Sequence, residues 1–130
     1  MTEVQIASLM LENREVFVGY LTVNALITFA VLFLAYVIRD SSIVARGLVF
    51  AGFLLSAILL RMTMEVTNEG FVALVGELGK LPSVTAFSQG PIDALSGGIP
   101  APYRIGAPAI QLINVVAAAY LFFVEKWSGR

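Results

Sequence analysis

The chain has 130 residues, of which 58% are hydrophobic and 13% are charged, and its net charge is −1. A soluble domain of this size could not bury so much apolar surface, so the composition predicts a single-domain integral membrane protein. The sequence contains no cysteine and no histidine, which excludes disulfides, thiolate metal sites and histidine-ligated haem, and the charge balance gives no indication of a nucleic-acid partner.

The first predicted span covers residues 16–38, with the sequence VFVGYLTVNALITFAVLFLAYVI. These 23 residues carry no charge and no proline, and a helix of this length crosses the hydrocarbon layer of about 30 Å. In the preceding residues 2–15, Ile6, Leu9 and Met10 fall on one helical face. This spacing predicts an amphipathic helix in the interface or running into the first span, with a partly ordered tail as the alternative.

The second predicted span covers residues 43–64. Only four residues, 39–42, separate it from the first span, so we expect the two helices to be antiparallel neighbours. Its uncharged stretch, residues 47–60, is short for a crossing and is bracketed by Arg46 and Arg61. Long arginine side chains can reach the headgroup region, so we interpret both as interfacial anchors. The alternative is a charged stripe that lines a pore or binds anionic lipid.

Residues 66–103 are predicted to form an insertion outside the membrane. Its first part, 66–81, has helical apolar periodicity, which predicts a short amphipathic helix that extends the second span or lies on the membrane surface. Residues 83–102 are rich in glycine and proline, which is typical of turns. We expect this stretch to cover the end of the bundle, re-enter the membrane or meet a partner. It contains no phosphate-binding glycine motif, so no nucleotide is assigned.

The third predicted span covers residues 105–124, with Pro108 in its first turn, where a missing N–H group is tolerated. Arg104 and Trp127 lie near its two ends and are predicted interfacial anchors. The expected fold is therefore an all-α integral membrane protein. It has three transmembrane helices, and a long loop that carries a short amphipathic helix joins spans two and three.

Polar and small residues within the spans form stripes at helical spacing. Polar groups in spans usually face protein, and small residues allow close helix approach. We therefore interpret these residues as contacts in a three-helix bundle or an oligomer, and the alternative is that they line an aqueous or substrate path. The candidates are Tyr20, Asn24 and Thr28 in the first span, Gly52 and Ser56 in the second, and Gln111 and Asn114 in the third.

The sequence offers no set of residues for catalysis. Acid–base chemistry requires positioned titratable groups, but every carboxylate lies at a membrane edge or in the insertion. Glu65 and Glu69 are one helical turn apart, yet this spacing is more typical of solvated acids at a helix end than of a metal site. We therefore expect no enzymatic activity, no catalytic or cofactor-binding residues, no cofactor and no metal.

Three spans would place the N-terminus and residues 66–103 on one side of the membrane and the C-terminus on the other. The basic residues near the membrane favour the C-terminus in the cytoplasm and the N-terminus outside, by four to three. They are Arg14, Arg61 and Arg104 on the N-terminal side and Arg39, Arg46, Lys126 and Arg130 on the other.

These patterns favour a small helical structural or accessory subunit of a membrane assembly or homo-oligomer. Its expected partners are the lipid bilayer and other membrane subunits or copies of itself. The alternative is a pore- or channel-forming protein, because the plan of three spans resembles that of three-span phage holins in topology. The chain departs from that plan in its long insertion and in a C-terminal tail without a basic cluster. An electron-transfer subunit is disfavoured, since histidine and cysteine are absent.

Overall fold

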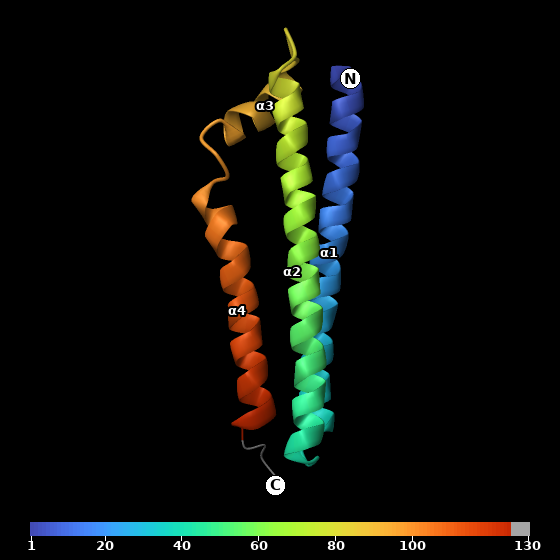
Figure 1. Cartoon of the computed structure of the whole chain (residues 1–130), viewed down its shortest axis with the longest axis vertical. Helices are drawn as coiled ribbons and strands as arrows, with labels where there is room; N and C mark the ends of the chain where they lie inside the picture. Colours follow the sequence, from blue (N-terminus) through green and yellow to red (C-terminus); the bar gives the residue numbers. More distant parts are fainter. Residues whose placement is uncertain (126–130) are drawn as a thin grey trace.

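The computed structural model of the chain describes residues 1–125, apart from the side chain of Tyr103. Its helices in chain order are α1 (Glu3–Val37), α2 (Ile43–Gly79), α3 (Ala86–Leu95) and α4 (Ala101–Phe123). α1 and α2 lie side by side as a long antiparallel hairpin, α3 crosses one end of it, and α4 runs back along the hairpin toward the other end (Figure 1). α1, α2 and α4 are long and apolar enough to cross a membrane. The predicted all-α fold with three such helices is confirmed.

Local hydrogen bonds define the ends of the hairpin helices. Thr2 and Gln5 form a reciprocal capping box at the start of α1, in which each side chain accepts from the other residue's backbone N–H. Ser42 caps α2 by accepting from the backbone N–H of Ala45 at 3.2 Å. α1 ends at Val37 and α2 begins at Ile43, and the two helices pack side by side. The predicted tight link between antiparallel neighbours is therefore confirmed.

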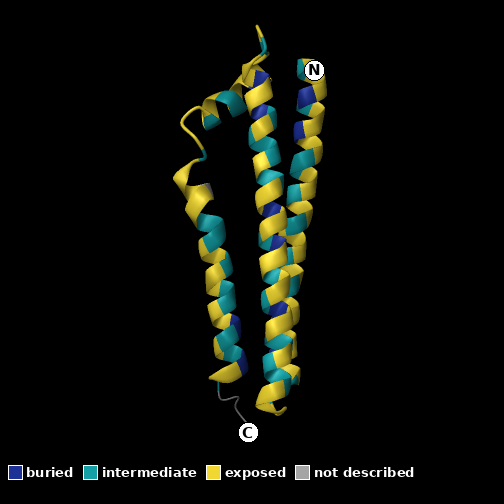
Figure 2. Ribbon diagram, in the orientation of Figure 1, coloured by how far each residue is buried: buried dark blue, intermediate teal, exposed yellow. Residues whose placement is uncertain are grey.

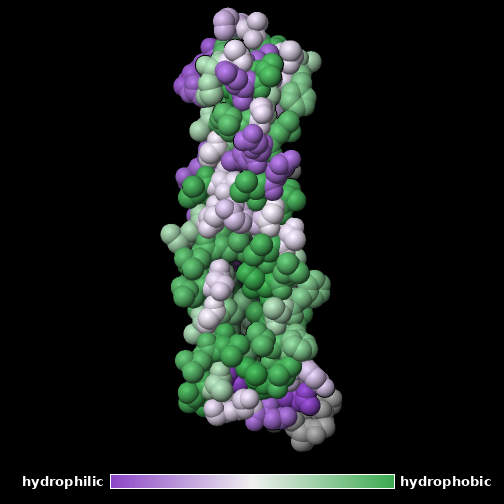
Figure 3. All heavy atoms as spheres, turned by 90° about the vertical axis from the view of Figure 1, so that its right-hand side faces the viewer, coloured by the Kyte–Doolittle hydropathy of each residue, from purple (hydrophilic) through white to green (hydrophobic). Residues whose placement is uncertain are grey.

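The hairpin is longer than a bilayer is thick. α1 has 35 residues and α2 has 37, so each is more than about 50 Å long, against a hydrocarbon layer of about 30 Å. The helical segments predicted at 2–15 and 66–81 are continuations of α1 and α2 and do not form separate surface helices. On the face shown in Figure 3, hydrophobic side chains form a belt, and hydrophilic side chains gather beyond both of its edges.

The part of the molecule beyond the belt at the N-terminal end consists of residues 3–15 of α1, residues 65–79 of α2 and the whole of α3. We call it the headpiece. Its buried side chains form a core separate from that of the candidate spans, with Phe71, Leu74 and Ile92 packed against it. The buried members are Ile6, Met10, Val75 and Leu78.

The short helix between the second and third spans lies at α3, in the stretch that the sequence presents as turns. Gly90 and Pro91 indicate a turn by local preference, yet both lie inside this helix. Packing overrides that preference, because Ile92 and Leu95 are one turn apart and both pack against the headpiece core. The helix predicted at residues 66–81 is thus present as the extension of the second span, one of its two predicted forms, and the short helix between the spans is α3 in the stretch predicted to form turns.

α4 begins at Ala101, four residues before the predicted start of the third span. Pro102 lies in its first turn, where the fixed φ of proline suits a helix and no N–H bond is lost. Pro108 consequently falls inside the helix, so its predicted place in the first turn was wrong.

A second core holds the three long helices together near the α1–α2 link. Aromatic rings dominate it, with the Phe50 ring centroid 6.1 Å from that of Phe122 and 5.4 Å from that of Phe123. Figure 2 shows buried residues along the inner faces of these helices and exposed ones on their outer faces. The fully or largely buried members are Val31, Ala35, Phe53, Ala118 and Phe122.

Candidate functional site

Polar side chains of α1 and α4 meet halfway along the candidate spans. Asn24 and Thr28 of α1 and Gln111 and Asn114 of α4 line one small space. α2 closes this space with the apolar side chains of Phe53, Ala57 and Leu60. The structure thus brings together four of the seven residues that the sequence singles out. We call these four residues the amide cluster.

The amide cluster has polar capacity that the chain itself leaves unused. Thr28 is satisfied by its own helix, because its hydroxyl donates to the carbonyl of Asn24 at 3.0 Å. Among residues 1–125, the side chains of Asn24, Gln111 and Asn114 form no hydrogen bond, and all three are half-buried. The space between them is about 10 Å³, which is near the lower limit for one water molecule. The cluster can therefore link helices directly or through a water, but it encloses no solute path within one copy.

The remaining three candidates lie elsewhere. Tyr20 is half-buried, one helical turn from Asn24 toward the headpiece, whereas Gly52 and Ser56 are exposed on α2. The Ser56 hydroxyl donates to the Gly52 carbonyl at 2.9 Å, so it needs no partner from another helix. A methyl group added at Gly52 would meet no atom within 4 Å. Within residues 1–125, this pair is therefore not packed against another helix and lies on the outer face of α2.

Arg46 ties α2 to the end of α4. Its Nη1 donates to the carbonyl of Phe122 at 2.9 Å, and its Nε is buried without a partner among the described residues. A cation at a helix C-terminus satisfies a free carbonyl and opposes the negative end of the helix dipole. Arg46 therefore joins α2 to the end of α4, in addition to any contact with lipid headgroups.

The other predicted anchors differ in their surroundings. Arg61 pairs with Glu65 one turn further along α2, with 2.8 Å between Nη2 and Oε1, and Arg104 is exposed in the first turn of α4. Trp127 lies outside the described residues.

A carboxylate of α1 caps α3 in the headpiece. Oε1 of Glu3 accepts from the backbone N–H and hydroxyl of Thr85, at 2.9 and 2.6 Å, and from the hydroxyl of Ser88 at 2.5 Å. These three donors, the Ser88 hydroxyl foremost, lower the pKa of the Glu3 carboxyl below its ordinary value. We call these hydrogen bonds of Glu3 to Thr85 and Ser88 the latch. The sequence does not indicate the latch, because its partners are more than 80 positions apart.

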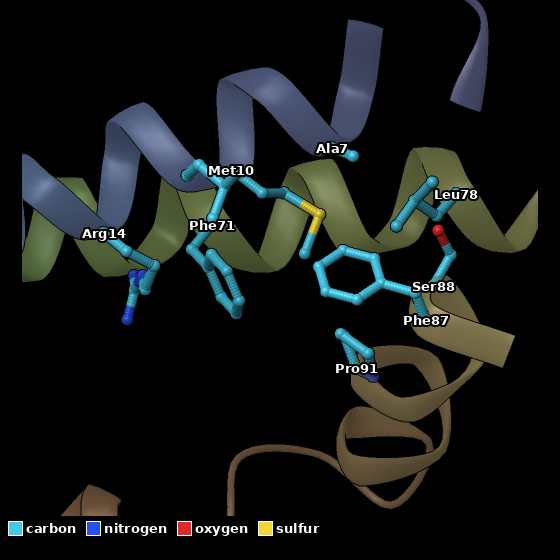
Figure 4. A pocket seen from close by; sticks show the side chains of 9 residues that line it. Ala7, Met10, Arg14, Phe71, Leu78, Phe87, Ser88 and Pro91 are labelled. Atoms are coloured by element: carbon cyan, nitrogen blue, oxygen red, sulfur yellow. The ribbon is translucent and has the colours of Figure 1, made fainter. Parts of the chain in front are cut away.

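A pocket of about 170 Å³ lies beside the latch, between α1, α2 and α3 (Figure 4). Its walls are almost entirely apolar, and the guanidinium of Arg14 lies at one end. Asn13, next to this arginine, donates from Nδ2 to the carbonyl of Thr67 at 2.9 Å, which fixes α1 against α2 at the edge of the belt. No sequence pattern indicates this pocket, because it forms only when α3 folds across the hairpin.

No three metal-binding side chains come together within residues 1–125. Comparisons with protein-family models, with curated proteins and with solved structures found no match to this chain.

Proposed function

We propose that the protein is a small, non-catalytic accessory subunit that packs in the membrane against other membrane proteins or further copies of itself. The observation that carries this proposal is the outward-facing pair Gly52 and Ser56 on α2, which no helix of the same chain covers. In lipid, helix association relies on close packing of small residues, because lipid tails are as apolar as side chains. An outward-facing pair of small residues at mid-span is a place that a neighbouring helix can approach closely.

The headpiece supports the same proposal from outside the bilayer. Residues 3–15 extend α1 by about 20 Å beyond the predicted span, and the headpiece has its own core and its own capping latch. A partner can therefore meet the protein both in the membrane and above it. We place the headpiece and the N-terminus outside and the C-terminus in the cytoplasm, in line with the distribution of basic residues.

Substitution on the outer face of α2 tests this function. We expect the full chain, extracted in mild detergent, to migrate in a complex heavier than its own mass of 14.0 kDa, as measured by light scattering during size-exclusion chromatography. Gly52→Leu should shift the protein toward the single chain, because the added side chain keeps a neighbouring helix at a distance. Ala25→Leu, at an exposed position of α1, is the size-matched control. A lone monomer that also fails to cross-link in its native membrane would contradict the proposal.

The pore-forming alternative makes a different prediction. The space in the amide cluster is too small for a solute path, so a pore would have to form between copies. The accessory function predicts that liposomes reconstituted at high protein density retain an encapsulated fluorescent dye. Leakage that rises with protein density would favour the pore instead.

A further inference from the structure

The headpiece pocket combines an apolar interior with one cationic end. Met10, Phe71 and Leu78 form walls from the hairpin, and Phe87 and Pro91 of α3 face them across the pocket (Figure 4). Its volume of about 170 Å³ is close to that of an engineered apolar cavity of about 150 Å³ that binds benzene. Phe87 is 69% exposed even though it lines the pocket, so apolar surface at the entrance is left uncovered.

Arg14 is held in place by aromatic rings and an amide, with no counter-charge in the part of the chain that the structure describes. Its guanidinium carbon lies 3.8 Å from the ring centroid of Phe71 and 4.9 Å from that of Phe17. Nη2 donates to the side-chain oxygen of Asn13 at 2.9 Å. Nε is buried without a hydrogen-bond partner, and the residue forms no ion pair within residues 1–125. A partly buried cation with no counter-charge among those residues is costly, and a bound anion would relieve that cost.

We propose that this pocket binds a small anionic amphiphile, with its carboxylate on Arg14 and its apolar body between α1, α2 and α3. Aromatic rings hold the planar guanidinium in one orientation, which favours paired hydrogen bonds to a carboxylate. The apolar body would cover Phe87 and fill the space beside Met10. This site is independent of the proposed function, since it requires neither a partner subunit nor an oligomer.

The geometry favours a free small molecule over two other anionic ligands, a phospholipid headgroup and an acidic peptide. A phospholipid with its phosphate at Arg14 directs its acyl chains into the bilayer, whereas the pocket extends from Arg14 away from the predicted span. A peptide needs partners for its backbone groups, but the walls are helices, whose backbone groups are already paired within the helix. A ligand with one charge and an otherwise apolar body matches what the pocket offers.

Calorimetric titration of the full chain in phosphatidylcholine nanodiscs tests this proposal, with empty nanodiscs as the blank. The probes are phenylbutyrate and its neutral analogue phenylbutanol. We expect saturable binding of phenylbutyrate, and binding of phenylbutanol that is at least about tenfold weaker. Arg14→Gln should weaken phenylbutyrate by at least about tenfold, while Arg14→Lys retains part of the affinity. Arg104→Gln, which changes an exposed arginine outside the pocket, should leave the affinity unchanged.

A pocket-filling variant separates the apolar part of the site from the charge. Ala7 lines the pocket, so Ala7→Leu should weaken both probes while Arg14 remains. Helix content by circular dichroism should equal that of the unaltered protein, which would show that the headpiece is still folded.

Several outcomes would overturn the proposal. They are equal affinities for phenylbutyrate and phenylbutanol, unchanged binding to Arg14→Gln, or no saturable binding at all. Loss of binding in phosphatidylglycerol nanodiscs would assign Arg14 to lipid headgroups instead. Tighter binding of an end-blocked aspartyl-phenylalanine dipeptide than of phenylbutyrate would assign the pocket to a polypeptide partner.

Discussion

At the scale of single residues, two charged side chains hold helices together at opposite ends of the molecule. Glu3 of α1 accepts three hydrogen bonds from the start of α3, and Arg46 of α2 donates to the end of α4. Each supplies a group that a helix end lacks, since the first N–H groups and last C=O groups of a helix have no partner within it. The contacts of both residues therefore decide how firmly the shorter helices are held.

Glu3 gives the headpiece a pH dependence. The pKa of its carboxyl is lowered in the folded protein, so ionised Glu3 stabilises the docked α3 above the ordinary carboxyl value. That contribution is lost as the pH falls from about 4.5 through the lower folded pKa. We expect hydrogen-exchange protection factors in α3 to fall over this range. Glu3→Gln should lower protection at neutral pH and remove this change with pH.

Glu12 provides the control for this pH effect. It is exposed on the same helix and contributes no hydrogen bond to α3 among the described residues. Glu12→Gln should retain the change in protection, and loss of the pH effect in this variant would contradict the role of Glu3.

Arg46 should stabilise the junction of α2 and α4. Arg46→Gln removes a charged hydrogen bond to a helix C-terminus, which is worth about 1.5 to 3 kcal/mol. We expect the free energy of unfolding, measured by titration with sodium dodecyl sulfate, to fall by about that amount. Arg39→Gln is the control, because within residues 1–125 the hydrogen bond and the ion pair of Arg39 are to Tyr36 and Asp40. Equal losses for the two variants would argue against a specific cap on α4.

At the scale of helices, the packing of α4 rests on a small residue. Ala118 is 2% exposed and lies in the core with Val31 and Phe122, whereas its neighbour Ala117 is exposed. Ala118→Leu should lower the free energy of unfolding by about 1 to 3 kcal/mol, because the added atoms force α4 from the hairpin. The same change at Ala117 should have little effect. A similar loss at both positions, in the same titration, would contradict the orientation of α4.

The helices differ in how far the sequence determines them. The long apolar runs predict α1, α2 and α4, because the absence of water within the bilayer leaves a helix as the only way to pair every backbone group. The position of α3 could not be predicted, because Gly90 and Pro91 oppose a helix locally and the core that compensates comes from α1 and α2. The start of α4 was predicted four residues too late, because charge and hydropathy indicate where a helix enters the membrane and not where the helix begins.

The candidate sites also differ in how far the sequence determines them. The amide cluster follows from polar residues at helical spacing, and three neighbouring helices leave few ways to arrange them. The pocket at Arg14 depends on how α3 lies across the hairpin, which local preferences do not encode. Gly52 and Ser56 form a visible small pair in the sequence, but only the packing of the three helices shows that they face outward.

At the scale of the whole molecule, the hairpin joins two environments. The apolar belt suits lipid (Figure 3), while α1 and α2 continue beyond it into the headpiece (Figure 1). α4 has 23 residues and is therefore about 34 Å long, which is close to the hydrocarbon thickness of about 30 Å. The core near the α1–α2 link and the headpiece core lie at opposite ends of this arrangement, so each end is held together independently.

The most direct test of the two membrane crossings of the hairpin is the labelling of single cysteines, because the chain has none of its own. The variants are Val4→Cys in α1, Ala94→Cys in α3 and Ser41→Cys in the link, all at exposed positions. An impermeant maleimide applied outside intact cells should label residues 4 and 94. It should label residue 41 only after the membrane is opened. Labelling of residue 41 from the same side as residue 4 would show that the hairpin does not cross the membrane.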